Sequence, residues 1–296
     1  MKVLNFGSLN MDYCYSVDHI VKEGETISSD TIRMNLGGKG FNQSVALARA
    51  GVPVYHAGLV GEEGLEFYDA CEDYGILSDY LKTVTGRCGH TIIQVDSSGQ
   101  NSIILCGGAN QKNTKEYVDE VLSNFKSGDL LLLQNEINEL PYLIDQAFAR
   151  GMTIVLNPSP LDSVIKHDCD LGKISVFVLN ETEGQQLTGM TTPTTIVAAM
   201  EASFSNSKIL LTLGKGGSIY HHGDEEYYQP AFDVQAVDTT AAGDTFTGFF
   251  IAGMIKKLPV RESLILATKA AALTVQKQGA AQSIPFMSEV EMAEFK

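Results

Sequence analysis

The sequence predicts an α/β fold in which one mostly parallel sheet lies between two layers of helices, with a small β lid attached. Three observations support this. Short, continuously apolar runs recur along the chain, helical patterns separate them, and two β-ribbon patterns interrupt the alternation. The repeated β-α-β order predicts right-handed crossovers and a layered sheet.

The predicted strands are short apolar runs. "KVLNF" at 2–6 and "VPVYHAGLV" at 52–60 are strands, and apolar runs follow at 129–134, 152–157, 175–180 and 208–214. Runs without polar alternation are typical of strands buried on both faces of a parallel sheet. A further short strand is predicted at 234–237.

Helical patterns lie between these runs. "FNQSVALARAG" ends at Gly51 and "EEGLEFYDACEDYG" ends at Gly75, because glycine after the last periodic residue is a helix stop. Further helices are predicted near 138–149, 181–188 and 194–204, from after Asp238 to about 257, and from about 260 to 277.

Two segments break the alternation. "MDYCYSVD" and "ISSDTIRMNLGG" resemble a pair of strands, and "CGHTIIQVDSSGQNSIILCGG" resembles a hairpin with Ser97, Ser98 and Gly99 in its turn. We therefore predict one domain over residues 1–296, with a discontinuous lid from about 12–36 and 88–108. Such ribbons suggest a lid or an oligomer surface.

Composition restricts the function. The 296 residues carry a net charge of −15, with 36 acidic and 21 basic residues, and no basic run occurs. This argues against nucleic acid or a membrane surface as a partner. The five cysteines form no C-x-x-C pair, which predicts reduced thiols in a cytoplasmic protein. The start of the sequence lacks a signal-peptide pattern, and no apolar run is long enough to span a membrane.

Polar clusters follow the predicted strands. In open α/β sheets, ligands bind at the carboxyl ends of strands, so these clusters are candidates for one shared site. Each cluster taken alone is also explained as a turn or a helix N-cap. The clusters are Asn10 and Asp12, Gln134 to Glu136, Asn157, Asn180 to Glu183, Gly214 to Gly217, and Asp238 to Asp244.

The stretch "NLGGKGFNQS" permits a tight turn or a close ligand approach, and Lys39 could serve a sugar or a phosphate. It matches neither the Walker A pattern nor the dinucleotide pattern G-x-G-x-x-G. A glycine-rich entry to a helix remains the alternative.

The stretch "VDTTAAGDTFTGFF" predicts an anion site with a base beside it. Ala241, Ala242 and Gly243 have no bulk, and a helix that starts there offers free N–H groups to an anion. Asp244 on the first turn can accept a proton from an attacking hydroxyl while those groups stabilise a transferring phosphoryl. Asp238 and Thr240 present oxygens that suit a hard cation.

These two stretches resemble the signature motifs of the ribokinase/PfkB family of sugar kinases. The resemblance continues, in family order, through "GSLNMD", "LNPSP", "NETEGQQLTG", "TLGKGG" and "KQGAAQSIP", and so covers almost the whole chain. It implies ATP-dependent phosphorylation of a sugar hydroxyl, most simply D-ribose to ribose 5-phosphate. Magnesium and a monovalent cation such as potassium are the implied cofactors.

The resemblance also implies roles for individual residues. Asp244 is the expected base, and the N–H groups of Ala241, Ala242, Gly243 and Asp244 the expected anion hole. The expected sugar-binding residues are Asn10, Asp12, Gly38, Lys39, Asn42 and Glu136, with Asp244. ATP is expected at Asn180, Glu183, Thr212, Gly214, Gly217, Gly243 and Thr268, with magnesium held indirectly by Glu183. The monovalent cation is expected at Asp238, Thr240, Thr274, Lys277, Gly279 and Ser283, partly through backbone carbonyls.

Two positions depart from the family pattern. Phe41 replaces a small residue beside Asn42, where it either alters the sugar pocket or packs into the core. Thr268 replaces the Asn or His that often meets adenine. In the family the β-ribbons act as a sugar lid and often clasp a second subunit, so the resemblance implies a homodimer. Deoxyribose, fructose or a nucleoside as substrate, and a non-catalytic sugar-sensing regulator, remain alternatives, and a dehydrogenase has only the β-α-β pattern in its favour.

Overall fold

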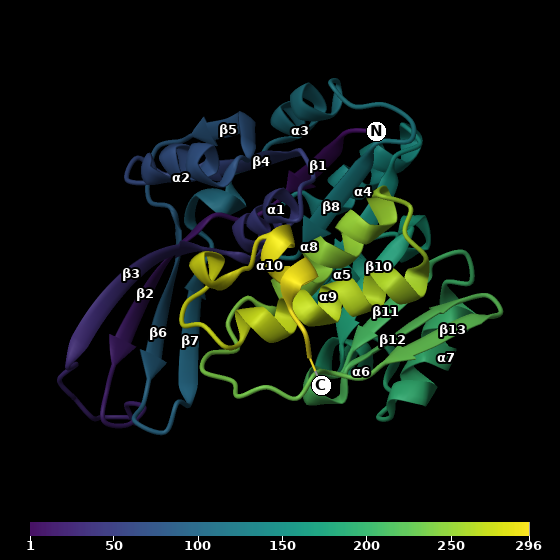
Figure 1. Ribbon diagram of the computed structural model, residues 1–296. Coiled ribbons are helices and arrows are strands. Elements are labelled where there is room, and N and C mark those ends of the chain that lie inside the picture. The colour runs from purple at the N-terminus through teal and green to yellow at the C-terminus, as the bar shows by residue number, and fades with distance from the viewer. Residues whose placement is uncertain (296) are drawn as a thin grey trace.

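The continuously apolar runs form the centre of a nine-stranded sheet, as the computed structural model of residues 1–295 shows (Figure 1). Its strand order is β13-β12-β11-β10-β9-β8-β1-β4-β5. The strands from β5 across to β11 are parallel, and β12 and β13 form an antiparallel edge. The strands are β1 (Val3–Phe6), β4 (Val54–Val60), β5 (Leu77–Thr83), β8 (Leu130–Gln134), β9 (Thr153–Asn157), β10 (Val176–Asn180), β11 (Lys208–Thr212), β12 (Ser218–His222) and β13 (Glu225–Gln229).

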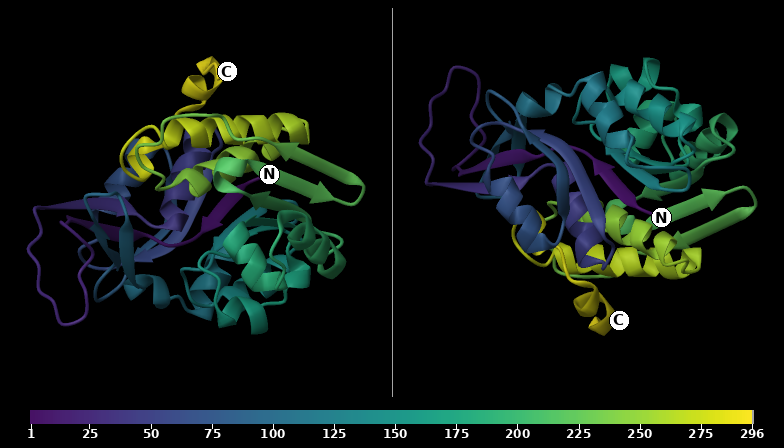
Figure 2. Two further views of the ribbon diagram at one scale, coloured as in Figure 1. Left: turned by 90° about the horizontal axis from the view of Figure 1, so that it is seen from below. Right: turned by 90° about the horizontal axis from the view of Figure 1, so that it is seen from above.

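The central strands are apolar at every position because each supplies two cores. In β8, Leu130 and Leu132 enter one hydrophobic cluster, while Leu131 and Leu133 enter the other. Helices cover both faces, as the views along the sheet show (Figure 2). The first face carries α1 (Lys39–Arg49), α2 (Glu66–Tyr74), α8 (Ala242–Ile255), α9 (Val260–Thr274) and α10 (Met287–Met292). The second carries α3 (Lys115–Leu122), α4 (Leu140–Ala149), α5 (Ser163–His167), α6 (Glu181–Thr188) and α7 (Pro193–Ser203).

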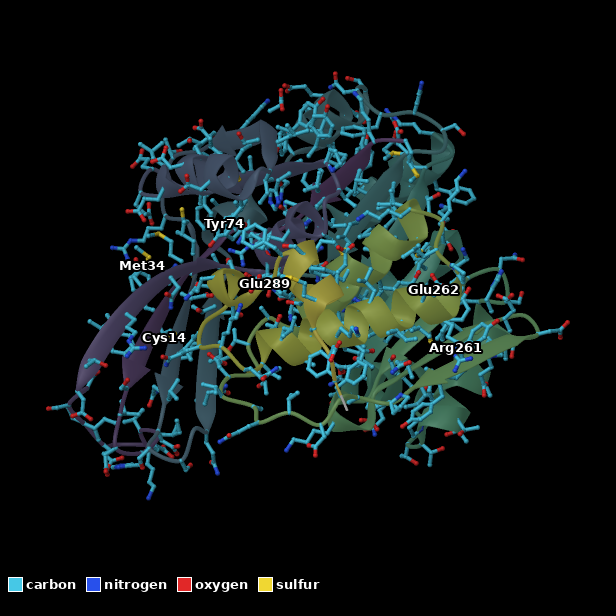
Figure 3. All side chains as sticks on the ribbon, viewed as in Figure 1. Cys14, Met34, Tyr74, Arg261, Glu262 and Glu289 are labelled. Atoms are coloured by element: carbon cyan, nitrogen blue, oxygen red, sulfur yellow. The ribbon has the colours of Figure 1, made fainter. Side chains whose placement is uncertain are left out.

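The predicted ribbons form a separate four-stranded sheet that projects from one side of the molecule (Figure 1). Its order is β3-β2-β6-β7, with β2 (Asn10–Ser16), β3 (Thr31–Gly37), β6 (Gly89–Val95) and β7 (Asn101–Cys106). We call this sheet the lid. Its hairpin turns where predicted, since Gly99 has φ +83° and its N–H donates to the carbonyl of Asp96. Cys14 and Met34 mark the lid in Figure 3.

Several predictions of local structure need correction. The strand predicted at 234–237 is wrong: this segment pairs with no strand, and Val234 and Ala236 instead line a cavity. The helix predicted from Phe41 already begins at Lys39, and the one predicted after Asp238 begins at Ala242. The sequence patterns did not predict β5, β12, β13, α3, α5 or α10. β5 and β13 are the two edge strands, where exposed polar residues interrupt the apolar pattern. β12 lies beside β13, and its sequence SIYHH is mostly polar.

None of the helices within residues 1–295 is long and apolar enough to cross a membrane.

Candidate active site

The polar residues that end the parallel strands lie along one edge of the sheet. Gln134 is aligned with Asn157 on the neighbouring strand, and Asn180 is aligned with Thr212 in the same way. The parallel register therefore places the carboxyl ends of β8, β9, β10 and β11 in one row, where open α/β sheets bind their ligands. The first turn of α8 and the start of α1 supply further residues of the site.

Helix α8 begins with an unusual backbone. Ala241, its N-cap, has φ 60° and ψ 6°, a left-handed conformation that is strained for a residue with a Cβ. The N–H of Ala242 donates to the carbonyl of Thr239 at 3.3 Å. The N–H groups of Gly243 and Asp244 have no such partner among residues 1–295, and a Cβ built at Gly243 meets no atom within 4 Å. The start of the helix is therefore open to an anion, chiefly at Gly243 and Asp244.

The carboxylate of Asp244 is buried and held by two amides of α1. Its Oδ2 accepts a hydrogen bond from Asn42 Nδ2 at 3.1 Å, and its Oδ1 accepts one from Gln43 Nε2 at 2.9 Å. The two helices approach closely at Gly248, where an added Cβ would lie 2.4 Å from the Cβ of Ala46. Asn42 on α1 therefore forms a hydrogen bond with a residue that lies 202 positions later in the sequence. Asn42 Oδ1 has no partner within residues 1–295, and this buried acceptor fits a sugar hydroxyl.

Gln43 joins Asp244 to a chain of buried amides. Its Nε2 also reaches Asn157 Oδ1 at 3.0 Å, and its Oε1 accepts a hydrogen bond from Gln134 Nε2 at 2.6 Å. Gln134 continues the chain to Asn5 Oδ1 at 3.0 Å. Gln43 was not among the predicted site residues, although it stands beside Asn42 in "NLGGKGFNQS". Its polar side chain inside an apolar helix pattern was the available signal.

The predicted sugar residues surround a second group of acidic side chains. Glu136 Oε2 accepts hydrogen bonds from Ser8 Oγ at 2.5 Å and from the N–H of Lys39 at 3.1 Å. Asn10 lies 3.4 Å from the same oxygen. Asp12 comes from the lid, where its Oδ1 accepts from Thr91 Oγ1 at 2.5 Å. Gly38, with φ 92°, makes the turn between the lid and α1.

Burial and mutual repulsion shift the titration of this group. Burial, opposed by the Thr91 hydrogen bond and reinforced by Glu136 and Asp244, raises the pKa of Asp12 to about 6. Burial also raises the pKa of Glu136, although Lys39 and Ser8 oppose it. For Lys39, burial lowers the pKa but the surrounding carboxylates outweigh it, so that the pKa lies above its usual value. Lys39 is therefore a fixed cation among several acids.

A cavity of about 580 Å³ opens beside the first turn of α8, within the size range of small-molecule sites. Of the predicted ATP residues, Thr212, Gly214, Gly217, Gly243 and Thr268 line it. The hydroxyl of Thr268 donates to the Leu264 carbonyl at 2.8 Å, so that the side chain presents mainly its methyl group. Lining residues that the sequence did not predict include Phe232, Val234, Phe246 and Ala272.

Asn180 and Glu183 do not line this cavity. Asn180 is the N-cap of α6, and its side chain and that of Glu183 form a capping box. Both Glu183 oxygens already accept hydrogen bonds from Asn180, at 3.0 and 2.8 Å. The helix-cap explanation therefore accounts for both residues. Glu183 fits magnesium only indirectly, through water.

The predicted cation residues come from two loops that Asp238 joins. Its Oδ1 accepts from the N–H and hydroxyl of Thr240, and its Oδ2 accepts from the N–H of Gly279 at 2.9 Å. Lys277 points its ammonium group at Glu289 instead, so only its backbone remains for a cation. No cluster of three or more His, Cys, Asp or Glu within residues 1–295 could hold a metal ion. The side chains of Asp238 and Lys277 are already engaged, so a monovalent cation here would be held mainly by backbone carbonyl oxygens.

The other two cation candidates use their hydroxyls locally. Thr274 donates to Thr245 Oγ1 and to the Ala270 carbonyl, and Ser283 donates to the Ala280 carbonyl.

Phe41, the departure from the family pattern beside Asn42, is fully buried and packs edge-on against Phe67 and Tyr74. It is a core residue on the side of α1 that faces away from Asp244.

A parallel sheet, a nucleotide-sized cavity at its carboxyl edge, and a buried carboxylate beside an open helix start together define a phosphotransferase for small molecules. Comparison with known proteins gives the particular family. The chain belongs to the pfkB family of carbohydrate kinases, whose model matches residues 1–287.

Similar proteins and solved structures support this family assignment. The chain is 34% identical over 292 residues to ribokinase of Haemophilus influenzae, which covers 96% of this chain and 95% of the relative. It is 32% identical over 304 residues to a deoxyribokinase of Salmonella typhi, with 98% and 97% covered. The structure of Arabidopsis thaliana ribokinase complexed with ribose and ATP aligns with a TM-score of 0.86 at 33% identity, covering 98% and 97% of the chains. The Thermotoga maritima ribokinase aligns with a TM-score of 0.87 at 31% identity, covering 98% of each chain.

Proposed function

We propose that this protein is a ribokinase, which transfers the γ-phosphoryl group of ATP to the 5-hydroxyl of D-ribose. The observation that carries the proposal is the position of Asp244. It combines a buried carboxylate, two amide donors that fix it, and unpartnered N–H groups on the same helical turn. The ribokinase relatives, and the ribose and ATP in the Arabidopsis complex, support the choice of sugar and nucleotide.

In this mechanism the sugar binds between the lid and α1. The carboxylates of Asp12 and Glu136 accept hydrogen bonds from its hydroxyls, the amide nitrogen of Asn10 donates one, and the free Oδ1 of Asn42 accepts one more. Asp244 takes the proton of the attacking hydroxyl. The N–H groups of Gly243 and Asp244 stabilise the charge on the transferring group, with Lys39 as the nearby cation.

The nucleotide occupies the 580 Å³ cavity, with its phosphates toward Gly243 and its base toward Thr268. Magnesium, when bound, neutralises charge on the phosphates. Glu183, which caps α6 and lies outside this cavity, would contact magnesium only through water. A monovalent cation held by the Asp238 and Gly279 loops would act on the anion hole indirectly, because Thr239 in that loop already bonds to Ala242.

A substrate panel tests the proposal. Initial rates of ADP formation are measured with ribose, 2-deoxyribose, fructose and adenosine at equal concentrations. We expect the highest kcat/KM for ribose. A higher value for 2-deoxyribose would favour the deoxyribokinase alternative, and absence of turnover with all four substrates would favour the non-catalytic regulator. The same assay with potassium replaced by tetramethylammonium should show a lower rate.

A further inference from the structure

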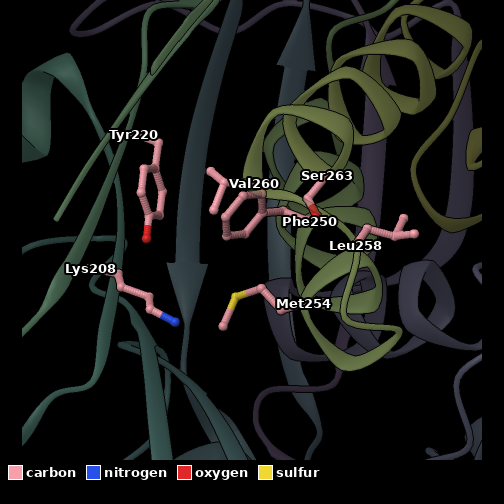
Figure 4. Close-up of a pocket in the computed structure, with 7 residues that line it drawn as sticks. All are labelled: Lys208, Tyr220, Phe250, Met254, Leu258, Val260 and Ser263. Carbon is pink, nitrogen blue, oxygen red and sulfur yellow. The ribbon is translucent and has the colours of Figure 1, made fainter. Parts of the chain in front are cut away.

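A second cavity lies at the amino end of β11 (Figure 4), whereas the candidate active site lies at the carboxyl ends of the strands. Its volume is about 150 Å³. It forms where the start of β11 and the middle of β12 face the C-terminal half of α8 and the first turn of α9. Lys208 begins the strand whose other end, Thr212, lines the nucleotide cavity. The two cavities are therefore separated by the length of β11.

The walls of this cavity are apolar, but two polar groups point into it. Phe250 and Met254 come from α8, and Leu258 and Val260 from the segment that follows it. The ammonium group of Lys208 and the hydroxyl of Tyr220 project between them from the strands (Figure 4). The remaining polar residue, Ser263, already donates its hydroxyl to the Pro259 carbonyl.

Neither of the two groups has a partner. Tyr220 is only 1% exposed, and its hydroxyl makes no hydrogen bond to any atom of residues 1–295. Burial, with Glu225 and Tyr227 nearby, raises the pKa of Tyr220 to about 12, so that the hydroxyl is a donor at neutral pH. Lys208 takes part in none of the ion pairs formed within residues 1–295. Tyr220 is a buried side chain, and the polar groups of buried side chains are nearly always satisfied, so its hydroxyl indicates a missing partner. Lys208 is only partly buried, and its ammonium group is free to bind the same partner.

We propose that this cavity binds a small organic monoanion with an apolar body, namely a short-chain or aromatic carboxylate. Its carboxylate accepts hydrogen bonds from Lys208 and Tyr220, and its body lies between Phe250, Met254 and Val260. An engineered cavity of about 150 Å³ holds one benzene molecule. Water is the weaker candidate, because about five molecules would share two free polar groups among apolar walls, whereas a buried water normally makes about three hydrogen bonds.

A ligand in this cavity would be connected to the active site through helix α8. It would contact Phe250 and Met254, which lie on the same helix as Asp244. The proposal nevertheless concerns binding alone, and it stands whether or not the protein is a ribokinase.

Saturation-transfer NMR with benzoate as the probe tests the proposal on the full chain, with ADP present to fill the nucleotide cavity. We expect saturable binding with a Kd on the order of 1 mM, as for a ligand of this size. Lys208→Met keeps the apolar stem and removes the charge, and should weaken binding about tenfold. Tyr220→Phe should weaken it about threefold. Benzamide, which has the same shape without the charge, should bind more weakly than benzoate.

Lys166→Met is the matched control, because Lys166 is an exposed lysine on α5 and its replacement changes the net charge equally. It should leave the benzoate Kd unchanged. Thermal melts verify that each variant folds. Absence of saturable binding to the unmodified protein would overturn the proposal, and so would equal affinity of the unmodified protein and Lys208→Met.

Discussion

Asp244 is the residue whose single substitution should reduce catalysis most. Asp244→Asn keeps the shape of the side chain and removes the base. We expect kcat to fall by roughly 10²–10⁴-fold, the usual scale for a positioned acid–base group, while ribose and ATP still bind. Steady-state kinetics and calorimetry of ligand binding measure the two effects. Asp168→Asn, at an exposed aspartate, is the control. Near-normal turnover of Asp244→Asn would remove the base assignment.

Gln43 fixes the orientation of that base without touching a substrate. Gln43→Leu removes the donor to Asp244 Oδ1, and it also removes one hydrogen bond each from Asn157 and Gln134. We expect kcat to fall about tenfold with little change in the KM for ribose. The acid limb of the pH–rate profile should move to higher pH, because a carboxylate that loses a donor holds its proton more readily. Gln43→Glu, which adds a negative charge, should move the limb further. A purely structural role would lower the melting temperature and leave the profile in place.

Asp12 should make stability depend on pH. Its pKa is about 6 in the folded protein, above the value of 3.8 for the unfolded chain, so the folded state binds the proton more tightly. The contribution of Asp12 to stability is thus complete below about pH 4 and is lost as the pH rises through 6. Asp12→Asn should therefore be more stable than the unmodified protein at pH 7, by roughly 2 kcal/mol, and nearly equal to it at pH 4. Urea unfolding at both pH values measures this, and a pH-independent difference would contradict the shift.

At the scale of elements, the contact between α1 and α8 brings the sugar motif to the base. A Cβ at Gly248 would lie 2.4 Å from the Cβ of Ala46 and 3.1 Å from backbone atoms of α1. Gly248→Ala should force the helices apart, lower the free energy of unfolding by about 1–3 kcal/mol, and reduce kcat. Urea unfolding and kinetics measure both effects.

A double substitution separates crowding from other effects of that change. Adding Ala46→Gly removes the atom that the new Cβ meets and should restore part of the stability and activity lost in Gly248→Ala. Losses that simply add would show that the contact with Ala46 is not the cause.

The elements also show what the sequence could and could not predict. Central strands such as β8 were predictable because they fill two cores and are apolar at every position. The edge strands β5 and β13 were not, because their exposed polar residues break that pattern. The same holds for β12, whose sequence SIYHH is mostly polar. The segment 234–237 has an apolar pattern that serves a cavity wall rather than a strand. Neither the role of Gln43 nor the cavity at Lys208 was visible, because both depend on distant segments meeting in three dimensions.

At the scale of the whole molecule, the lid carries more apolar surface than a free sheet should expose. Ile32, Ile103 and Ile104 are each more than half exposed, and Met34, Ile92 and Leu105 are also exposed. Ile93 pairs with Ile103 and Ile92 with Ile104, so the apolar side chains lie on both faces of the lid. Large exposed apolar patches mark sites of association. We therefore propose that two copies of the chain associate through their lids, and the dimer is expected at about twice the mass of 32.0 kDa.

Sedimentation velocity of two single variants tests this association and identifies the face involved. Ile103→Glu and Ile104→Glu place a charge on opposite faces of the same strand. The variant whose charge falls within the interface should sediment as a monomer, because an unpaired buried charge costs several kcal/mol. The other should remain a dimer and acts as the control. Because Asp12 and Thr91 also belong to the lid, the monomeric variant should show a higher KM for ribose. Dimers in both variants would place the interface elsewhere.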